Sequence, residues 1–197
     1  MLSKYSTWRI SPWRQAEAKK LFENLSPHFC RFLEAGCAEG YILNKVKADE
    51  KYGFDFDAKR IAEARKKYPC INFTVQNAEK TNYKKEFFDG LICFHLLEHV
   101  PNPENAVSEC ARILKKNGQA VFAVPCERIK GDTTLNPEEH LHKFKNAEFS
   151  GLLDRYFKIE KAFFNTLVPS VFKEIKNTRQ YSLIYNLSYS MMFFYRK

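Results

Sequence analysis

Short apolar runs alternate with amphipathic segments along most of the chain. Three runs are almost uninterrupted in apolar residues, which is typical of strands buried on both faces of a parallel sheet. These runs are residues 28–35, 88–96 and 119–125. Segments 51–56 and 71–76 have the composition of two further strands.

Helices are expected between these strands and at the amino end. The segment 102–118 begins with an asparagine that can cap a helix and ends at Gly118, a residue that often follows a helix. Similar signals predict helices over residues 13–25, 40–47 and 57–69. Alternation of strands with helices predicts right-handed βαβ units, which build a parallel sheet covered by helices on both faces.

The carboxyl-terminal part continues the pattern and then changes it. A helix is expected over residues 146–157 and a strand over 158–165. Apolar and polar residues alternate over 182–192, which predicts an antiparallel strand added to the sheet. The expected fold is therefore an α/β, Rossmann-like three-layer α/β/α sandwich, with a mostly parallel sheet and an antiparallel C-terminal strand.

The net charge of +9 is concentrated at the two ends of the chain. Residues 1–32 have a net charge of +4, residues 33–150 of zero and residues 151–197 of +5. A basic surface could attract an anionic partner such as nucleic acid. No compact run of Lys and Arg supports that partner, so we favour lysines on solvated faces.

Other bulk features exclude several classes of protein. No run approaches the 18 apolar residues of a membrane span. The start of the chain lacks the apolar region of a signal peptide. The six cysteines form no CxxC pair, so we expect thiols in a reducing cytoplasm and no zinc site.

Chemically useful residues follow several of the predicted strands. Ligands of open parallel sheets bind beyond the carboxyl ends of the strands. Glu34, Gly36 and Gly40 follow the first strand, and Asp55 follows the second. The glycines alone fit either a ligand-binding loop or a tight turn. An acid about twenty residues after them can accept hydrogen bonds from ribose hydroxyls, which indicates NAD, a flavin or S-adenosylmethionine.

The motifs together resemble those of the class I S-adenosylmethionine-dependent methyltransferases. The similar segments are ExGCxxG at 34–40, GFDFDAKRIAEARKKYP at 53–69, NAEK at 77–80 and HLLEHV at 95–100. The resemblance covers roughly residues 29–160 and is strongest to the small-molecule branch that includes ubiquinone and menaquinone biosynthesis methyltransferases. It implies that the cofactor is S-adenosylmethionine.

The resemblance also implies a cofactor site. Its residues would be Arg14, Glu34, Gly36, Cys37, Gly40, Asp55, Phe56, Asn77, Ala78, Phe94 and His95. Glu34 and Gly36 would face the methionine amino group, and Arg14 would meet the methionine carboxylate. Gly40 would let the cofactor approach the loop, while Cys37 would be a small buried residue of that loop and not a nucleophile.

The remaining residues would bind the nucleoside and line the path of the methyl group. Asp55 would bind the ribose hydroxyls, Phe56 would pack on adenine, and Asn77 with Ala78 would meet the adenine edge. Phe94 and His95 would line the path of the methyl group. Two residues depart from the family pattern. Ala38 replaces a common glycine, and Asn77 stands where an aspartate is usual, which would weaken binding of the cofactor.

Proton removal from an acceptor would require a base near neutral pH, and histidine is suited to that role. We expect His95, His140 and His142 to be the catalytic candidates, because they follow the fourth and fifth strands. His99 is more often a structural hydrogen-bonding residue in the family. Glu138, Glu139 and His140 lack a second ligand cluster in the sequence, so no metal is expected.

The chain is interpreted as one domain over residues 1–197. Residues 1–28 would form a helical lid, 29–126 the cofactor-binding core, and 127–197 the substrate-side loop and C-terminal strands. The expected activity is methyl transfer to oxygen or nitrogen of a small molecule, with anionic acceptors included, by a cytoplasmic monomer or homodimer. Alternatives are an RNA or protein methyltransferase that uses the basic ends, or a non-catalytic partner protein. A nicotinamide dehydrogenase is disfavoured by the glycine spacing.

Overall fold

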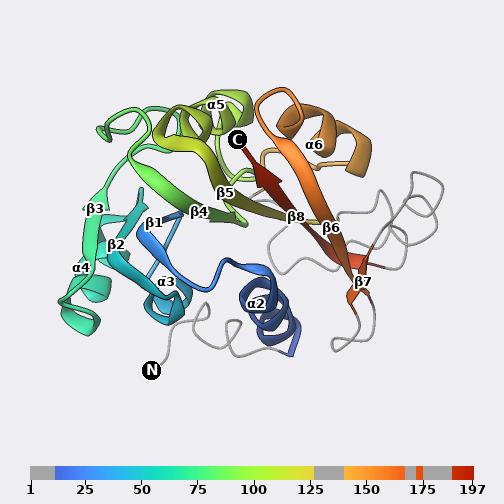
Figure 1. Cartoon of the computed structure of the whole chain (residues 1–197). Coiled ribbons are helices and arrows are strands. Elements are labelled where there is room, and N and C mark those ends of the chain that lie inside the picture. Colours follow the sequence, from blue (N-terminus) through green and yellow to red (C-terminus); the bar gives the residue numbers. More distant parts are fainter. Residues whose placement is uncertain (1–11, 127–139, 167–171, 175–187) are drawn as a thin grey trace.

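The computed structural model describes residues 12–126, 140–166, 172–174 and 188–197 (Figure 1). One sheet of eight strands runs through it. Its spatial order is β3 (Asn72–Val75), β2 (Ala48–Asp55), β1 (Phe29–Ala35), β4 (Phe88–Phe94), β5 (Leu114–Pro125), β8 (Ser188–Arg196), β6 (Lys158–Thr166) and β7 (Phe172–Glu174). The described helices are α2 (Pro12–Asn24), α3 (Tyr41–Lys45), α4 (Ala58–Lys67), α5 (Pro103–Ile113) and α6 (Asn146–Leu153).

The strand order reverses once among the parallel strands. Strands β1 to β5 pair in parallel, with β2 and β3 on one side of β1 and β4 and β5 on the other. Strand β8 is antiparallel to both β5 and β6, and β7 is antiparallel to β6. The predicted fold class, including its antiparallel C-terminal strand, is confirmed. The switch point lies between β1 and β4, where such sheets bind ligands.

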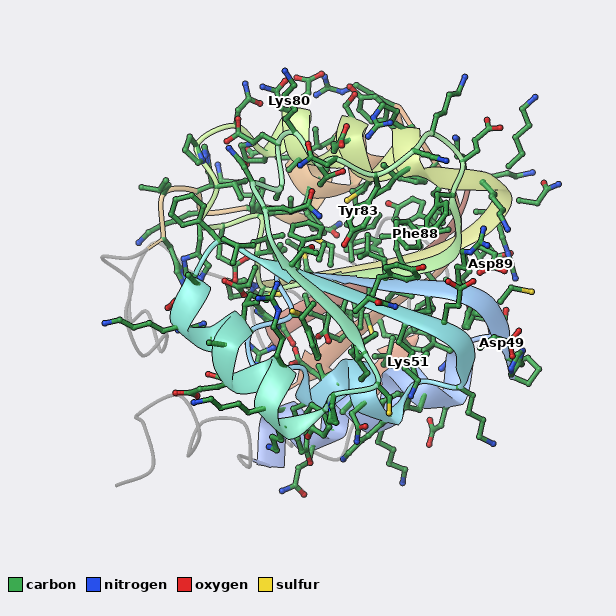
Figure 2. The ribbon with its side chains drawn as sticks, turned by 90° about the vertical axis from the view of Figure 1, so that its left-hand side faces the viewer. Asp49, Lys51, Lys80, Tyr83, Phe88 and Asp89 are labelled. Carbon is green, nitrogen blue, oxygen red and sulfur yellow. The ribbon has the colours of Figure 1, made fainter. Side chains whose placement is uncertain are left out.

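Helices cover both faces of the sheet. Helices α5 and α6 lie on one face, and α2, α3 and α4 lie on the other (Figure 1). Neighbouring strand residues point alternately to the two faces, as Phe32 and Leu33 of β1 do. Figure 2 shows Tyr83 and Phe88 together within the core, with ring centroids 4.9 Å apart. Each face of the sheet therefore has its own apolar core.

Several element boundaries differ from the sequence prediction, and two of the differences follow from strand pairing. The helix expected over 102–118 ends at Ile113, because Leu114 turns extended and pairs with Phe88 in the sheet. The final strand, expected over 182–192, continues to Arg196; its described residues are Ser188–Arg196, and residues 182–187 of the expectation lie outside the described part. Residues 191–195 of this strand are buried throughout, because β8 lies between β5 and β6 in the middle of the sheet.

Two expectations about whole-chain properties can be compared with this fold. All six cysteines lie within the described residues, and none of them forms a disulfide. In the same described residues, no helix has both the length and the apolar character needed to cross a membrane. The division into lid, core and substrate-side segments stays a prediction, since residues 1–11 and 127–139 are outside the described part.

Candidate functional site

The loop after β1 has an unusual backbone conformation. Gly36, Ala38 and Gly40 all have positive φ, at +70°, +47° and +73°. Glycine adopts this conformation without a Cβ clash, whereas alanine does so at a cost. The loop therefore turns sharply three times before α3 begins at Tyr41. The positive φ at Ala38 is a conformation that glycine adopts at no cost, which fits the glycine that the family resemblance led us to expect there.

Asp55, at the carboxyl end of β2, fixes this loop. Its Oδ2 atom accepts a hydrogen bond from the Ala38 N–H at 2.8 Å, and its Oδ1 atom accepts one from the Asp57 N–H at 3.0 Å. The Cys37 N–H donates to the Phe54 carbonyl at 2.9 Å. The glycine loop is thus folded against the end of β2, with the Asp55 carboxylate at the junction.

Glu34 holds the other side of the loop. Its side chain is buried, and Oε2 accepts a hydrogen bond from the Leu43 N–H at 2.9 Å. This contact ties the end of β1 to the first turn of α3. Cys37 is buried within the apolar core on the same face of the sheet, in agreement with its expected packing role.

Phe56 and Asn77 follow the ends of the adjacent strands β2 and β3. The Phe56 side chain is 81% exposed, which is exceptional for a large apolar residue in this chain. The Asn77 Oδ1 atom accepts a hydrogen bond from the Glu79 N–H at 2.9 Å, and Ala78 between them is buried. An exposed aromatic ring beside an asparagine turn and a carboxylate is a surface suited to a nucleoside.

Gly40 gives a stability prediction for this loop. A Cβ atom at Gly40 would lie 2.5 Å from Cζ of Phe73, in a backbone region that alanine avoids. We expect Gly40→Ala to lower the free energy of unfolding by about 2–4 kcal/mol, from strain and overpacking together. Urea denaturation measures this change. The matched control is Gly151→Ala in α6, where no atom lies within 4 Å of the added Cβ; an equal loss there would refute the steric explanation.

A second group of polar residues lies at the end of β4. His95 has a positive φ of +51°, and its backbone N–H donates to the Ala123 carbonyl of β5. Its Nε2 atom lies 3.2 Å from Oε1 of Glu17 in α2, and its Nδ1 atom lies 3.4 Å from Oε1 of Glu98. Both ring nitrogens of His95 therefore face carboxylates.

Glu17 connects this group to two more elements. Arg14 donates to Glu17 Oε2 at 2.8 Å, and the Ser190 hydroxyl of β8 donates to Glu17 Oε1. The Glu17 carboxylate is only 3% exposed. Helix α2 is thus joined to the ends of β4 and β8 through one buried carboxylate.

The charges of this group hold one another in their ionised forms. Burial alone would raise the pKa of Glu17, but Arg14 and His95 lower it to about 2. Burial also favours the neutral form of His95, as does Arg14, yet Glu17 and Glu98 raise the His95 pKa above its usual value. Burial opposes ionisation of Glu98, and His95 lowers the pKa of Glu98.

The segment after β5 lies against the same residues. The backbone N–H groups of Leu141 and His142 both donate to the Glu98 carbonyl, at 2.8 Å and 3.1 Å. This pairing places the His140 ring 4.8 Å from the His99 ring, centroid to centroid. The His142 Nε2 atom lies 3.2 Å from the Pro101 carbonyl oxygen. Burial lowers the pKa of His140.

The sequence-predicted residues thus fall into two groups. The first surrounds the loop after β1 and the ends of β2 and β3, and the second surrounds the end of β4. Phe94 is buried at the end of β4, directly before His95. Two residues of the second group were missed. Glu98 lies within HLLEHV, a segment in which only the histidines were assigned a role, and Glu17 lies in a helix with no distinguishing motif.

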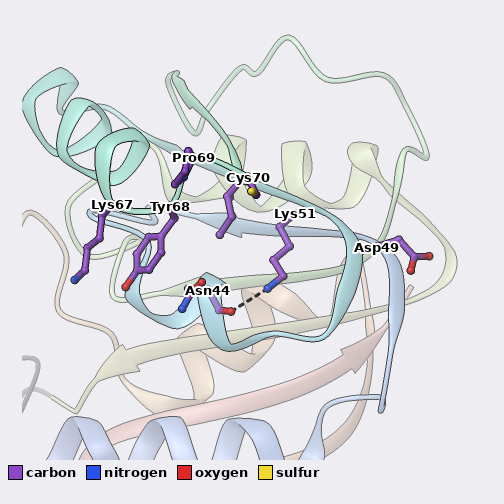
Figure 3. A pocket seen from close by; sticks show the side chains of 8 residues that line it. Asn44, Asp49, Lys51, Lys67, Tyr68, Pro69 and Cys70 are labelled. Atoms are coloured by element: carbon purple, nitrogen blue, oxygen red, sulfur yellow. Dashed lines mark hydrogen bonds between the residues drawn. The ribbon is translucent and has the colours of Figure 1, made fainter.

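A pocket elsewhere contains none of the predicted site residues. It has a volume of about 350 Å³ and is lined by Asn44, Asp49, Lys51, Lys67, Tyr68, Pro69, Cys70 and Ile71 (Figure 3). Lys51 donates to the Asn44 carbonyl at 2.9 Å within it. Its lining comes from α3, the amino-terminal part of β2, the end of α4 and the segment before β3, so it is separate from the strand ends described above.

Comparisons with known proteins found similar domains, relatives and folds. A family model described as a methyltransferase domain matches residues 33–122. The chain is 32% identical over 128 residues to a probable S-adenosylmethionine-dependent methyltransferase of Mycolicibacterium smegmatis, covering 62% of this chain and 49% of that protein. It is 27% identical over 128 residues to a ubiquinone biosynthesis O-methyltransferase of Alkalilimnicola ehrlichii, covering 60% and 48%. The chain thus spans about half the length of these curated relatives.

A solved structure shows the same fold over nearly the full length. It is a methyltransferase of Thermotoga maritima that depends on S-adenosylmethionine and is described as a possible histamine N-methyltransferase. The TM-score is 0.76 at 21% identity, and the alignment covers 100% of this chain and 96% of that one. Residues 33–122 thus match a methyltransferase domain, and the chain is similar in sequence and in its Rossmann-like fold to S-adenosylmethionine-dependent methyltransferases.

Proposed function

We propose that this chain transfers the methyl group of S-adenosylmethionine to an oxygen or nitrogen atom of a small molecule and releases S-adenosylhomocysteine. The observation that carries the proposal is the junction between the loop at residues 36–40 and Asp55, with Phe56 exposed beside it. A carboxylate and an exposed aromatic ring at adjacent positions suit a ribose and an adenine.

In this proposal the first group of residues binds the cofactor. Asp55 accepts hydrogen bonds from both ribose hydroxyls, and Phe56 stacks on adenine. Asn77 accepts from the adenine amino group, while buried Ala78 leaves room for the ring edge. Backbone groups at Gly36 and Gly40 lie close to the methionine part, with Glu34 and Cys37 supporting them from the core side.

Methyl transfer itself needs accurate positioning more than acid–base chemistry. The sulfonium carries a positive charge and a good leaving group, so holding the acceptor in line with the methyl carbon supplies most of the rate enhancement. Phe94 and His95 would line that approach. Arg14 donates to Glu17 at 2.8 Å, and the proposed contact with the methionine carboxylate would be made alongside this ion pair, since a guanidinium carries five N–H donors.

A hydroxyl or ammonium acceptor must also lose a proton. Both His95 nitrogens lie next to carboxylates, and the His142 Nε2 atom lies next to a carbonyl oxygen. His95 in its protonated form would orient or bind an anionic acceptor better than it would accept a proton. His140, whose pKa is lowered by burial, is the better candidate for proton removal, alone or through a cation bound beside it.

Two other functions remain as alternatives. The basic ends favour an RNA or protein acceptor, and the other alternative is a non-catalytic partner protein. The similarity to a ubiquinone biosynthesis O-methyltransferase favours the small-molecule acceptor. A cytoplasmic location and a monomeric or homodimeric state stay predictions from the sequence.

Calorimetry and a binding assay separate these functions. S-adenosylhomocysteine should bind at one site per chain, and total absence of binding would support the non-catalytic alternative. The protein is also titrated into tRNA at low and at moderate salt. Binding that weakens steeply with salt would favour the nucleic-acid alternative, because phosphate contacts release counterions. The small-molecule proposal expects no tRNA complex at moderate salt.

A further inference from the structure

Three potential metal ligands meet beside the end of β4. Glu98, His99 and His140 each offer one ligand atom, and these atoms all lie within 4.8 Å of one another. Glu98 and His99 come from the segment after β4, and His140 comes from the segment after β5. The two backbone hydrogen bonds to the Glu98 carbonyl hold these segments together, so the cluster results from a defined pairing of two chain segments.

Glu98 has a carboxylate oxygen that forms no hydrogen bond with any described residue. Its side chain is 1% exposed, and within the described residues Oε2 has no hydrogen-bond partner. Oε1, in contrast, lies 3.4 Å from His95 Nδ1 and 4.0 Å from His99 Nε2. A buried carboxylate oxygen without a partner is costly, which makes such an atom rare in native structures. A cation bound at Glu98 would remove this cost.

The donor types indicate which cation would bind. Two imidazoles and one carboxylate are a ligand set for first-row transition metals, whereas magnesium and calcium prefer oxygen ligands alone. Three protein ligands also leave coordination positions open, which is typical of catalytic metal sites and not of structural ones. The His99 side chain is 38% exposed, so an ion has a path from solvent to the cluster.

We propose that Glu98, His99 and His140 bind a divalent transition-metal ion, whose open positions take an oxygen or nitrogen atom of the methyl acceptor. The second part rests on the proposed function. Metal–ligand bonds of about 2.0–2.2 Å require ligand atoms about 3.3–3.6 Å apart, so the histidine rings rotate toward Glu98 on binding. A hydroxyl or amine bound to the ion would have a lowered pKa and would lose its proton to solvent water, so no histidine base would be needed.

The test uses Zn²⁺ and Co²⁺ with the full chain and no cofactor. Zn²⁺ is titrated by calorimetry into the wild-type protein, His140→Ala and His99→Ala, and Co²⁺ binding is followed by its visible absorption spectrum. One ion per chain should bind with a dissociation constant of about 1 μM or tighter, and each variant should weaken binding by about 100-fold or more. The Co²⁺ spectrum should be that of a four- or five-coordinate ion.

His28→Ala is the matched control. His28 is an exposed histidine directly before β1, and it pairs at 3.1 Å with Asp49 near the amino end of β2. Both residues lie at the amino ends of these strands, whereas the cluster follows the carboxyl end of β4. Its removal should leave Zn²⁺ affinity unchanged. Circular dichroism and thermal unfolding check that each variant is folded.

Two results would overturn the metal site. One is wild-type binding weaker than about 1 mM, and the other is equal affinity in the wild type and in folded His140→Ala. S-adenosylhomocysteine binding by the metal-free protein is measured in parallel. If the cofactor binds and the metal does not, only this inference fails. If the metal binds and the cofactor does not, the proposed function fails together with the acceptor part of this inference, and the metal site stands.

Discussion

Asp55→Ala should weaken the binding of S-adenosylhomocysteine by about 100-fold or more. The substitution removes a carboxylate that would accept two ribose hydroxyls, and hydrogen bonds to a charged group contribute about 1.5–3 kcal/mol each. It also removes the acceptor of the Ala38 N–H, which holds the glycine loop against β2. Calorimetry on the folded variant measures the affinity, and each 1.4 kcal/mol lost corresponds to about tenfold.

Asp49→Ala provides the matched control for Asp55. Asp49 is an exposed aspartate of the same strand, and it lies toward the opposite end of β2 (Figure 2). Its substitution should leave cofactor affinity unchanged. If Asp55→Ala folds normally and binds S-adenosylhomocysteine as well as Asp49→Ala does, the assignment of the ribose site to the end of β2 is wrong.

Glu17→Gln should lower the free energy of unfolding by about 3–5 kcal/mol. The glutamine has the shape of glutamate but no charge, so Arg14 and His95 lose their shared buried carboxylate. Leaving a buried charge without its partner has a cost of this size. Urea denaturation at neutral pH measures the change. Glu23→Gln in the same helix is the control, because Glu23 is exposed and its ion pair with Lys20 is long, at 3.4 Å; its effect should stay within about 0.5 kcal/mol.

The same carboxylate gives an expected pH dependence of stability. The pKa of Glu17 is about 2 in the folded protein and 4.5 as its ordinary value. Its contribution is therefore complete above pH 4.5 and is lost as the pH falls toward 2, to a total of roughly 3 kcal/mol. His95 acts in the opposite direction: its raised pKa contributes stability below the ordinary value of 6.5, and this is lost as pH rises through the folded pKa.

Denaturation midpoints of the wild type and Glu17→Gln, measured from neutral pH down to about pH 3, test this dependence. The two curves should converge as the pH falls. A constant gap between them over that range would show that Glu17 is not the group responsible.

The first group of site residues could be predicted because these residues lie directly after the ends of strands. Buried parallel strands are recognised in the sequence as apolar runs. The fold class then places the residues that follow each run, such as Asp55 and Asn77, at the ligand-binding edge of the sheet. The positive φ at Gly36 and Gly40 follows the same reasoning, since a sharp turn must connect β1 with α3. Phe56 could be assigned only through the family resemblance, and its exposure is consistent with that role.

The second group of site residues is brought together by contacts between segments that are distant in the sequence. No local sequence pattern predicts such contacts. Glu17 meets Ser190 across 173 positions of sequence. Glu98 meets the segment after β5 through its backbone carbonyl, a group that every residue has. The sequence therefore indicated the histidines but not the carboxylates that surround them, and it gave no reason to expect a metal cluster. The end of α5 was also misplaced, because strand pairing at Leu114 outweighs the helical pattern.

The most direct test of the proposed activity is transfer of a labelled methyl group. The wild-type protein and Asp55→Ala are incubated with S-adenosylmethionine carrying an isotopic methyl group, together with a cell extract that contains small molecules, RNA and protein. The fractions are then separated and analysed by mass spectrometry. We expect the label in a small-molecule product that carries it on oxygen or nitrogen, with the wild type only. Label confined to RNA or protein, or no transfer by a protein that binds S-adenosylhomocysteine, would contradict the account.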